Sequence, residues 1–457
     1  MLTYLLKKAP GVPLYEALYR CIRSDILSGA LRPGEKLPSK RALAAHLKVS
    51  KITVEGAYDQ LLEEGYLRSV EKVGYFVEKT DRPAPVQPVP PAQPEKEAGP
   101  EFRIDLTANG TNRFPFSVWS RLQREVLQDL GEDLLKPMPN QGLFSLRQAI
   151  AEHLAGFRGL RVRPENILVG AGTDFLYNLL VQLLGRDRVF AMEEPGYDKI
   201  REIYGAAGVR CLSAELDSEG VRPEALSGAQ VLHISPAHHF PTGRITSVRR
   251  RRQLLQWAEE QPDRCIIEDD YDSEFRFGSH PLPTMASLDR SGKVIYMNSF
   301  SKSLAPSIRL GYMVLPDPLM KKFRDTLSFY SCTVPSFEQE VLARFLSRGF
   351  FEKHLNRMRK FYRQQRNRTA AAFEACPEFS IHEENAGLHF LVKADVRLSD
   401  RALVDTFAGA GIKIRTLGSY YHGPVPDEAR HALVVNYSAL RESQLTELEL
   451  ILKELSF

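Results

Sequence analysis

A proline-rich segment near the N-terminus divides this chain and limits what it can fold into. The segment covers residues 81–101, DRPAPVQPVPPAQPEKEAGPE, and seven of its 21 residues are proline. Proline lacks a backbone N–H and interrupts helices and sheets, so the segment favours an extended spacer of up to about 3.1 Å per residue. A surface loop inside one domain is the alternative, but structureless loops above roughly 12–15 residues are uncommon in compact domains. We therefore expect residues 1–80 and 102–457 to fold separately.

Length and composition describe a multidomain globular protein. The chain has 457 residues, 43% hydrophobic and 26% charged, and a domain typically has about 100–200 residues. No apolar run approaches the roughly 20 residues of a membrane helix, and the N-terminus lacks the pattern of a signal peptide. Five cysteines are widely spaced without a C-x-x-C pair, which predicts reduced thiols, a cytoplasmic location and no structural metal. They are Cys21, Cys211, Cys265, Cys332 and Cys376.

The excess positive charge lies entirely in the first segment. The whole chain has a formal net charge of +4. Residues 1–80 carry 13 Lys and Arg against 9 Asp and Glu, and the remaining residues balance. A basic small domain suits binding to phosphates, although an excess of four is mild.

The first segment predicts three helices and a hairpin. Apolar residues recur at helical spacing from Leu14 to Ser28, and Gly29 is a natural stop. Ser39 is a candidate N-cap for a short second helix, and Ser50 for a third that ends near Gly65. Two short segments follow, residues 66–68 and 75–77, on either side of a turn expected around Gly74, and they predict a two-stranded wing. Two helices, a tight turn and a hairpin form a winged helix-turn-helix.

This segment resembles the GntR-type DNA-binding domain, most specifically in LRPGEKLPSKRALAAHLKVSKITV, residues 31–54. The resemblance implies that the third helix enters the major groove of operator DNA with its first residues. The wing, SVEKVGYFV, departs from the usual basic, glycine-rich tip. A winged helix that binds protein is the alternative. The DNA-contacting residues implied are Ser39, Lys40, Arg41, Ser50, Lys51 and Thr53.

The larger region alternates strand and helix signals. Residues 167–169, 265–267 and 294–297 are short apolar runs typical of buried parallel strands. The first is followed by a glycine turn and a helix expected over residues 173–184. We predict an α/β domain with a mainly parallel sheet and an α+β subdomain from about residue 345.

Three motifs carry chemistry in this region. Lys302 follows a buried strand within NSFSKSLAPSIRLGYMVLP, residues 298–316, beside several serines and Arg309. An amine, hydroxyls and an arginine fork suit pyridoxal phosphate (PLP), which needs a Schiff base and phosphate donors. The motif CIIEDDYDSEFRF, residues 265–277, offers a carboxylate for a pyridine nitrogen, although a metal or a solvated turn is the commoner use. The motif VGAGTDFLYNLL, residues 169–180, places backbone amides at a helix start, where anions bind.

In this chain order the motifs resemble fold-type I aminotransferases, and with the first segment the chain resembles the MocR family of regulators. SPAHHFPTG (235–243), EEPGYDKI (193–200), FSKSLAPSIRLGY (300–312) and HLNRMR (354–359) also match that family. The resemblance implies that Lys302 forms the Schiff base, Asp269 pairs with the pyridine nitrogen and Tyr271 contacts the ring oxygen. It places Tyr197 near the ring. The phosphate would be bound by Ser299, Ser301, Arg309 and the amides near Gly172 and Thr173.

Three positions depart from aminotransferases. Asp174 stands at the helix start, so we expect its carboxylate to point away from the phosphate or to bind an amide. Phe240 replaces an asparagine that bonds the ring oxygen. Val434 stands where an arginine reads the substrate carboxylate, and a valine cannot form that bidentate pair. Arg415 and Arg441 are candidate substitutes.

Two polar runs have less specific meanings. Arg249 to Arg252 form a basic run, for which we expect a solvated helix start in preference to a DNA-facing patch. His238 and His239 could suggest a metal, but other ligands at suitable spacing are lacking, so structural or ring-side roles are expected.

Three functions follow as hypotheses. The first is a DNA-binding regulator whose PLP domain senses PLP or an amine, with at most slow transaminase activity. The second is a working aminotransferase with a DNA-binding appendage. The third is a repressor with a vestigial domain that binds no cofactor; intact Lys302, Asp269, Tyr271 and Arg309 argue against it. The resemblance also implies a head-to-tail, domain-swapped homodimer, which suits two operator half-sites.

Overall fold

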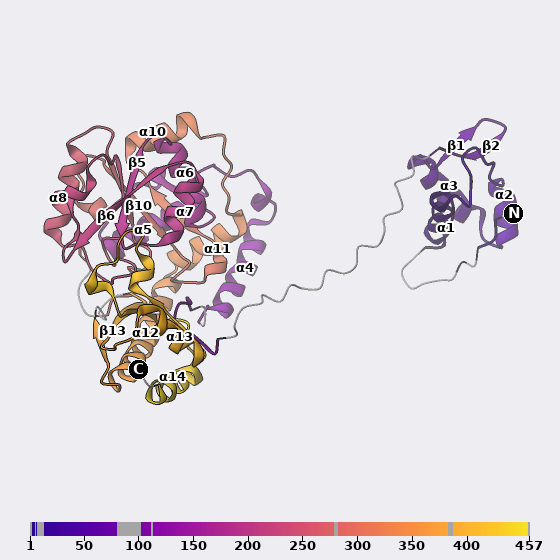
Figure 1. The fold of residues 1–457 in the computed structure, drawn as a ribbon. Helices are drawn as coiled ribbons and strands as arrows, with labels where there is room; N and C mark the ends of the chain where they lie inside the picture. The colour runs from indigo at the N-terminus through magenta and orange to yellow at the C-terminus, as the bar shows by residue number, and fades with distance from the viewer. Residues whose placement is uncertain are drawn as a thin grey trace. The chain divides into compact units, whose positions relative to one another are not determined.

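The computed structural model describes residues 2–4, 6, 13–79, 102–110, 113–277, 282–382 and 387–455. The chain forms two compact units, Met1–Gly99 and Pro100–Phe457, and each is described by itself (Figure 1). The spacer predicted for residues 81–101 lies outside the described residues.

The first unit is a three-helix winged fold. Its elements are α1 (Leu14–Ser28), α2 (Lys40–Leu47), α3 (Lys51–Glu63), β1 (Leu67–Val70) and β2 (Gly74–Val77). The two strands pair antiparallel. The three helices were predicted, but the turn of the hairpin was misplaced: it covers residues 71–73, and Gly74 begins the second strand, with its Cα opposite that of Val70.

Serine caps fix where the second and third helices begin. The Ser39 hydroxyl accepts from the Ala42 amide at 3.2 Å, and the Ser50 hydroxyl accepts from the Thr53 amide at 3.1 Å. Gly29 ends α1 in the left-handed conformation. The three helices bury one common core that includes Leu18, Val54 and Tyr58, each 0% exposed. Small caps and one apolar face thus account for the unit.

An eight-stranded sheet organises the second unit, in the order β4-β11-β10-β9-β8-β5-β6-β7. Four neighbouring pairs are parallel, from β10 through β9, β8 and β5 to β6, so the expected mainly parallel sheet is confirmed. Every residue of the central strands β8, β9 and β10 is buried. Strands buried on both faces read as continuous apolar runs, which is why they were visible in the sequence. The strands are β4 (Ile167–Gly170), β5 (Val189–Glu194), β6 (Arg210–Asp217), β7 (Gly220–Val221), β8 (Val231–Ile234), β9 (Cys265–Asp269), β10 (Val294–Ser299) and β11 (Gly311–Val314).

Helices pack around this sheet, as Figure 1 shows for α5, α6, α7 and α8. The helix predicted over residues 173–184 is present as α6. The helices of this part are α4 (Phe116–Leu130), α5 (Phe144–Arg158), α6 (Thr173–Leu184), α7 (Asp198–Ala206), α8 (Val248–Glu259), α9 (Met285–Leu288), α10 (Asp317–Thr326) and α11 (Ser336–Ser347).

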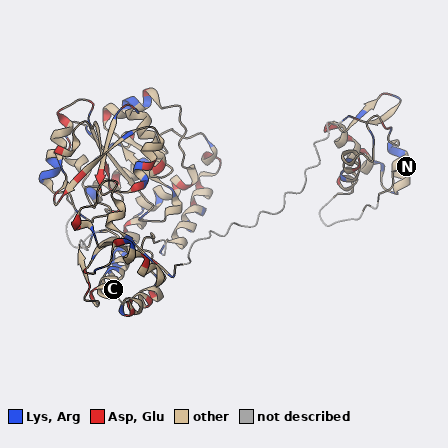
Figure 2. Ribbon diagram, viewed as in Figure 1, with Lys and Arg blue, Asp and Glu red and all other residues tan. Residues whose placement is uncertain are grey.

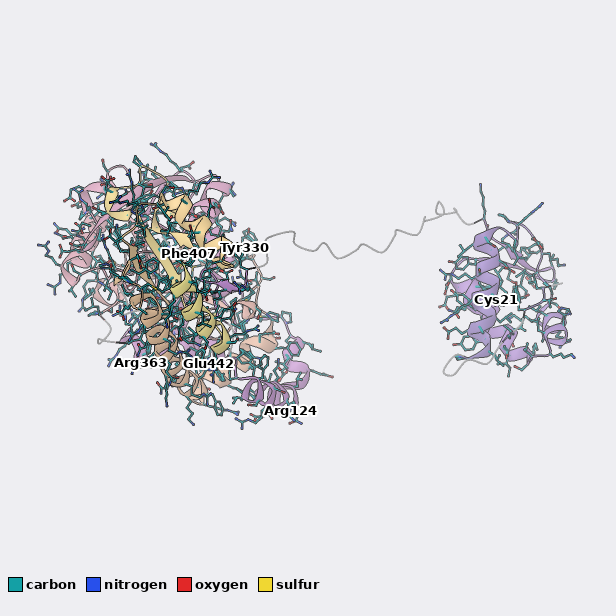
Figure 3. All side chains as sticks on the ribbon, turned by 60° about the horizontal axis from the view of Figure 1, so that its bottom comes forward. Cys21, Arg124, Tyr330, Arg363, Phe407 and Glu442 are labelled. Carbon is teal, nitrogen blue, oxygen red and sulfur yellow. The ribbon has the colours of Figure 1, made fainter. Side chains whose placement is uncertain are left out.

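The C-terminal part adds a four-stranded sheet in the order β12-β13-β16-β15. Its helices α12 and α14 pack together, and Figure 3 labels Arg363 on the first and Glu442 on the second. A separate short pair joins β14 to β3 (Ile104–Asp105). The elements are α12 (Phe350–Glu374), β12 (Phe379–His382), β13 (His389–Ala394), α13 (Asp400–Gly409), β14 (Ile412–Lys413), β15 (Arg415–Thr416), β16 (Ala432–Asn436) and α14 (Glu442–Glu454). Among the described residues, no helix is both long and apolar enough to cross a membrane.

Candidate functional sites

A cavity of about 610 Å³ lies at the carboxyl ends of the central strands. Asp269 ends β9 and Ser299 ends β10, and both line this cavity. In open α/β sheets ligands bind outside the carboxyl ends of the strands, so its position suits a binding site. Eight of the nine residues predicted to bind the cofactor line it: Lys302, Asp269, Tyr271, Ser299, Ser301, Arg309, Thr173 and Tyr197. The ninth, Gly172, directly precedes Thr173.

Lys302 contributes an amine that is poised for nucleophilic chemistry. Its Nζ donates to the Oδ1 of Asn109, which also accepts from Asn436 at 3.1 Å. Desolvation lowers the pKa of the Lys302 ammonium to about 8, against a partial opposing effect of the Asp272 carboxylate. Nucleophilic lysines are activated in this way, because a lower pKa populates the neutral amine.

Asp269 is held with one oxygen unused. Its Oδ2 accepts from the Tyr177 hydroxyl at 2.5 Å and lies 3.6 Å from the Nε2 of His233. Its Oδ1 is buried and has no hydrogen-bond partner among the described residues. A buried carboxylate oxygen without a donor is costly, and a protonated pyridine nitrogen would supply one.

A candidate phosphate cradle lies at the start of α6. Gly172 precedes this helix with φ +84°, and a Cβ there would come within 2.7 Å of the Arg309 Nη2. Only glycine therefore lets the arginine approach the helix N-terminus, where backbone amides bind anions. Ser299 and Ser301 line the same cavity. These donors, Lys302 and the open oxygen of Asp269 together fit PLP, which would supply an electron-accepting ring when bound.

Asp174 occupies this cradle in a way that the sequence analysis did not predict. Its Oδ2 lies 2.8 Å from the Lys199 Nζ and 3.0 Å from the Arg309 Nη2. The expectation that it points away or binds an amide was wrong, because two cations converge on it. Burial raises the pKa of Asp174, but the hydrogen bonds and charges of Lys199 and Arg309 outweigh burial and hold that pKa below its ordinary value.

Aromatic residues shape the middle of the cavity. Tyr197 packs edge-on against Phe240, with ring centroids 5.7 Å apart. Phe240 also contacts the rings of Tyr420 and His389. The Tyr271 hydroxyl lies 3.2 Å from the Nδ1 of His238. Phe240 is therefore an apolar wall of the cavity.

Two arginine candidates for the missing carboxylate reader separate in space. Arg415 lines the cavity together with Val434. Arg441 precedes α14 as its N-cap and is not among the residues lining this cavity. The structure thus favours Arg415 of the two.

The predicted polar runs have structural roles. Arg250 and Arg251 are 6% and 0% exposed, so a solvated helix start was wrong for both. Arg251 donates to the carbonyls of Pro236, Thr246 and Pro283, which explains how its charge is tolerated.

His238 lies in a buried polar cluster beside the cavity. Its Nδ1 lies 2.7 Å from the Asp272 Oδ2, and one ligand atom each of His238, Asp272 and His389 lie within 4.8 Å of one another. Within the described residues this group has the spacing of metal ligands. A metal was discounted from the sequence because ligands at suitable spacing were lacking, and His389 lies far from His238 along the chain. The hydrogen bond between His238 and Asp272 agrees with the structural role expected for the histidine pair.

Sequence reasoning missed four residues of the site. Tyr177 and His233 hold Asp269, Asn109 holds Lys302, and Lys199 holds Asp174. A polar residue inside an otherwise apolar strand, as at His233 in VLHI, was a usable signal. Tyr177 and Lys199 lie within the motifs of residues 169–180 and 193–200, but their partners come from distant segments, as does Asn109.

The DNA-binding candidates cluster at the starts of α2 and α3, and Figure 2 shows Lys and Arg on α2. Arg41 and Lys51 are exposed, and Lys51 has one weak pairing, 4.0 Å from Glu55. Lys40 differs: its Nζ lies 2.9 Å from Asp59 and sits over the Tyr75 ring. The Lys40 charge is thus used within the unit.

Comparisons with known proteins identify both units of the chain. Residues 14–77 match the family described as bacterial regulatory proteins, gntR family, and residues 104–418 match aminotransferase class I and II. Solved structures are similar in fold to the second unit. Kynurenine aminotransferase from Pyrococcus horikoshii matches with a TM-score of 0.67 and 24% identity, over 78% of this chain and 91% of its own. A multiple substrate aminotransferase from Thermococcus profundus matches with a TM-score of 0.68 and 22% identity, over 78% and 91%.

Full-length relatives combine the two units. The HTH-type transcriptional regulator YdeL of Bacillus subtilis is 36% identical over 98% of this chain and 97% of its own. The probable rhizopine catabolism regulatory protein MocR of Rhizobium meliloti is 33% identical over 92% and 90%. The pyridoxine biosynthesis regulator PdxR of Corynebacterium glutamicum is 30% identical over 89% and 88%. The class I and II aminotransferase domain makes PLP the cofactor. The chain belongs to the MocR family of HTH-type transcriptional regulators, in which a GntR-type DNA-binding domain precedes an aminotransferase-like PLP domain.

Proposed function

We propose that the aminotransferase-like domain of this regulator is a sensor. It binds PLP through a Schiff base on Lys302 and responds either to PLP itself or to an amine that takes the place of Lys302. The observation that carries this proposal is the pairing, on one cavity, of an activated lysine with the open oxygen of Asp269. The same chain has a DNA-binding domain on which a sensor can act.

Different residues of the cavity hold different parts of the cofactor. Asp269 pairs with the pyridine nitrogen, and Tyr271 contacts the ring oxygen. Tyr197 lies beside the ring. The phosphate is bound by Ser299, Ser301, Arg309 and the backbone near Gly172 and Thr173. The glycine geometry and the cavity lining support these roles.

The walls of the cavity favour binding over turnover. Val434 removes the arginine that fixes a substrate carboxylate, and Phe240 removes an amide from the ring oxygen. Fast reaction requires a substrate held close to its reactive geometry. A sensor function therefore explains these residues of the site better than a transaminase function does.

DNA binding is proposed to use the starts of two helices. Arg41 and Lys51 offer exposed charges for phosphates, and Thr53 lies in the first turn of α3. Ser39 and Ser50 cap the helices whose amides can also contact phosphate. Lys40 donates to the Asp59 carboxylate, so we propose that it holds α2 against α3 beside the DNA.

Assembly and location follow from the DNA target. We propose a head-to-tail, domain-swapped homodimer that presents two DNA-binding domains to two half-sites. A regulator of this kind works in the cytoplasm, where bacterial DNA lies. Ligand binding shifts the regulator only if two arrangements of the domains bind the ligand differently.

Two measurements on the full-length chain test the sensor. The first is a DNA-binding titration without cofactor, with PLP, and with PLP plus an amine, for the wild type and Lys302→Ala. The second is the production of keto acid. We expect a Schiff-base absorbance that Lys302→Ala abolishes, and DNA affinity that changes with ligand. Turnover near about 1–1,000 per second with unchanged DNA affinity would establish the transaminase instead.

A further inference from the structure

We propose that Arg415 reads an acid group of the ligand from the strand opposite the lost arginine position. The ligand is then a primary amine that also carries a carboxylate or a similar anion. This inference rests on the proposed function, because it names the chemical class of ligand that the sensor cavity accepts.

The register of the C-terminal sheet places Arg415 correctly. Strands β15 and β16 pair antiparallel, with the Cα of Arg415 opposite that of Val434. Directly opposite residues project to the same face of a sheet, with Cβ atoms about 4.5–5.5 Å apart. Both residues line the cavity that contains Lys302. The guanidinium missing at 434 is thus restored from the neighbouring strand.

The Arg415 guanidinium is held in one orientation. It stacks on the Tyr420 ring, with its central carbon 4.0 Å from the ring centroid. Its Nε donates to the Ser419 hydroxyl and its Nη2 to the Ser419 carbonyl, both at 3.1 Å. A guanidinium held in one orientation on the cavity suits an incoming anion, because little side-chain freedom remains to be lost.

Asp198 is an internal competitor for the same fork. Its Oδ2 accepts from the Arg415 Nη2 at 3.1 Å, and its Oδ1 lies 3.5 Å from the His422 Nε2. The side chains of Arg415 and Asp198 are 40% and 31% exposed, and such partly solvated pairs are weak. A ligand anion can therefore share the guanidinium or displace Asp198 at small cost.

Three other cations on the cavity also form ion pairs and differ from Arg415 in geometry. Lys413 pairs with Asp105 at 3.2 Å, and Lys199 with Asp174 at 2.8 Å. Arg201 lies 3.5 Å from Glu194, whose side chain is 6% exposed. None of the three has both the planar fork and the register with Val434. Arg415 is therefore the residue assigned to the ligand anion.

The test compares matched ligands on the PLP-loaded, full-length chain. The probes are β-alanine, 4-aminobutanoate and 5-aminopentanoate, each beside the alkylamine with the same carbon chain but no acid group. Those amines are ethylamine, propylamine and butylamine. Binding is followed by the absorbance of the bound cofactor. We expect at least one amino carboxylate to bind the wild type more tightly than its matched amine.

Variants assign this preference to a residue. Arg415→Gln should weaken the preferred amino carboxylate about 10- to 100-fold, the loss of a charge-assisted pair, and leave the matched amine unchanged. Asp198→Asn should strengthen the amino carboxylate alone. Arg441→Gln, the other candidate, should retain the preference.

Several results overturn the inference: no preference in the wild type, an undiminished preference in Arg415→Gln, or equal weakening of both ligands in that variant. Thermal denaturation checks that each variant is folded. Failure of the sensor proposal gives a different result. The ligand preference would then be present, but none of the probes would change the affinity for DNA.

Discussion

Asp174 and Arg309 form an ion pair across the cradle at the start of α6, with the Asp174 Oδ2 3.0 Å from the Arg309 Nη2. Arg309 is the arginine expected to bind the cofactor phosphate. The pair therefore makes the phosphate compete with a carboxylate of the protein itself. Lys199 offers Asp174 an alternative partner at 2.8 Å, so Arg309 can be released without leaving Asp174 unpaired.

Replacing Asp174 should therefore tighten cofactor binding. Asp174→Asn removes a negative charge next to a dianionic phosphate, and we expect the dissociation constant of PLP to fall roughly tenfold. Titration of the cofactor-free chain with PLP, followed by absorbance, measures it. Asp187→Asn, an exposed aspartate in the turn after α6, is the control for a change of net charge. Weaker PLP binding by Asp174→Asn would show that the carboxylate helps to hold the cofactor.

The pKa of Lys302 predicts how cofactor uptake depends on pH. Burial lowers this pKa to about 8, so the amine is protonated and unreactive below pH 8 and neutral above it. The rate of PLP incorporation should rise with pH and level off above about 8, far below the 10.4 of an ordinary lysine. The Asp272 charge opposes this lowering, so Asp272→Asn should move the midpoint to lower pH. Stopped-flow absorbance at several pH values measures it, and an unchanged or raised midpoint in the variant would contradict the assignment.

Local signals explain what the sequence predicted well. Ser39 and Ser50 cap helices with hydrogen bonds that span three residues. The strand that ends at Asp269 begins with the apolar run Cys265–Ile267 because all of its residues are buried within the sheet. In these cases the cause of the structure lies within a few residues of the pattern.

Contacts between distant segments explain which site residues could not be predicted from the sequence. Lys199 reaches Asp174 across 25 positions, and Arg415 reaches Asp198 across 217. No local pattern records such pairs. The run of arginines from 249 to 252 was wrongly expected to be solvated for the same reason. Arg251 is buried with hydrogen bonds to carbonyls that include one from Pro283, 32 positions away.

Arg251 should consequently be important for stability. Arg251→Leu would leave three carbonyls without their donor and would remove a charge 4.0 Å from the buried Glu268. We expect it to lower the free energy of unfolding by about 3–5 kcal/mol. Arg252→Leu changes the exposed neighbour and should stay within roughly 0.5 kcal/mol. Chemical denaturation compares the two, and equal effects would show that burial of Arg251 contributes nothing.

Three basic residues of the DNA-binding domain should differ in how much they contribute to operator binding. Arg41→Ala and Lys51→Ala should each weaken operator binding and reduce the log–log salt slope by about one unit, the signature of a lost phosphate contact. Lys40→Ala should lower the melting temperature of the domain with little change in slope, because its charge pairs with Asp59. Fluorescence anisotropy over a salt series distinguishes these outcomes. Arg20→Ala on α1 is the control. A full unit of slope lost in Lys40→Ala would reassign Lys40 to phosphate.

Ile52 predicts how the regulator reads sequence. It is the second residue of α3 and is 78% exposed, between Lys51 and Thr53. The first residues of a recognition helix face base edges, and an apolar side chain there can contact the 5-methyl group of thymine. We therefore expect a thymine in each half-site whose methyl packs on Ile52.

Uracil tests this contact because it removes only the methyl group. Operators selected from random DNA by the wild type would be remade with one thymine at a time replaced by uracil. At one position per half-site, uracil should lower the affinity of the wild type about 3- to 10-fold. This is the value of burying one methyl group or slightly more. Ile52→Ala should bind the thymine operator more weakly and be insensitive to uracil at that position alone. Ile52→Val should keep most of the effect. If Ile52→Ala loses as much affinity to uracil as the wild type does, the methyl group is read by another residue and Ile52 has no part in specificity.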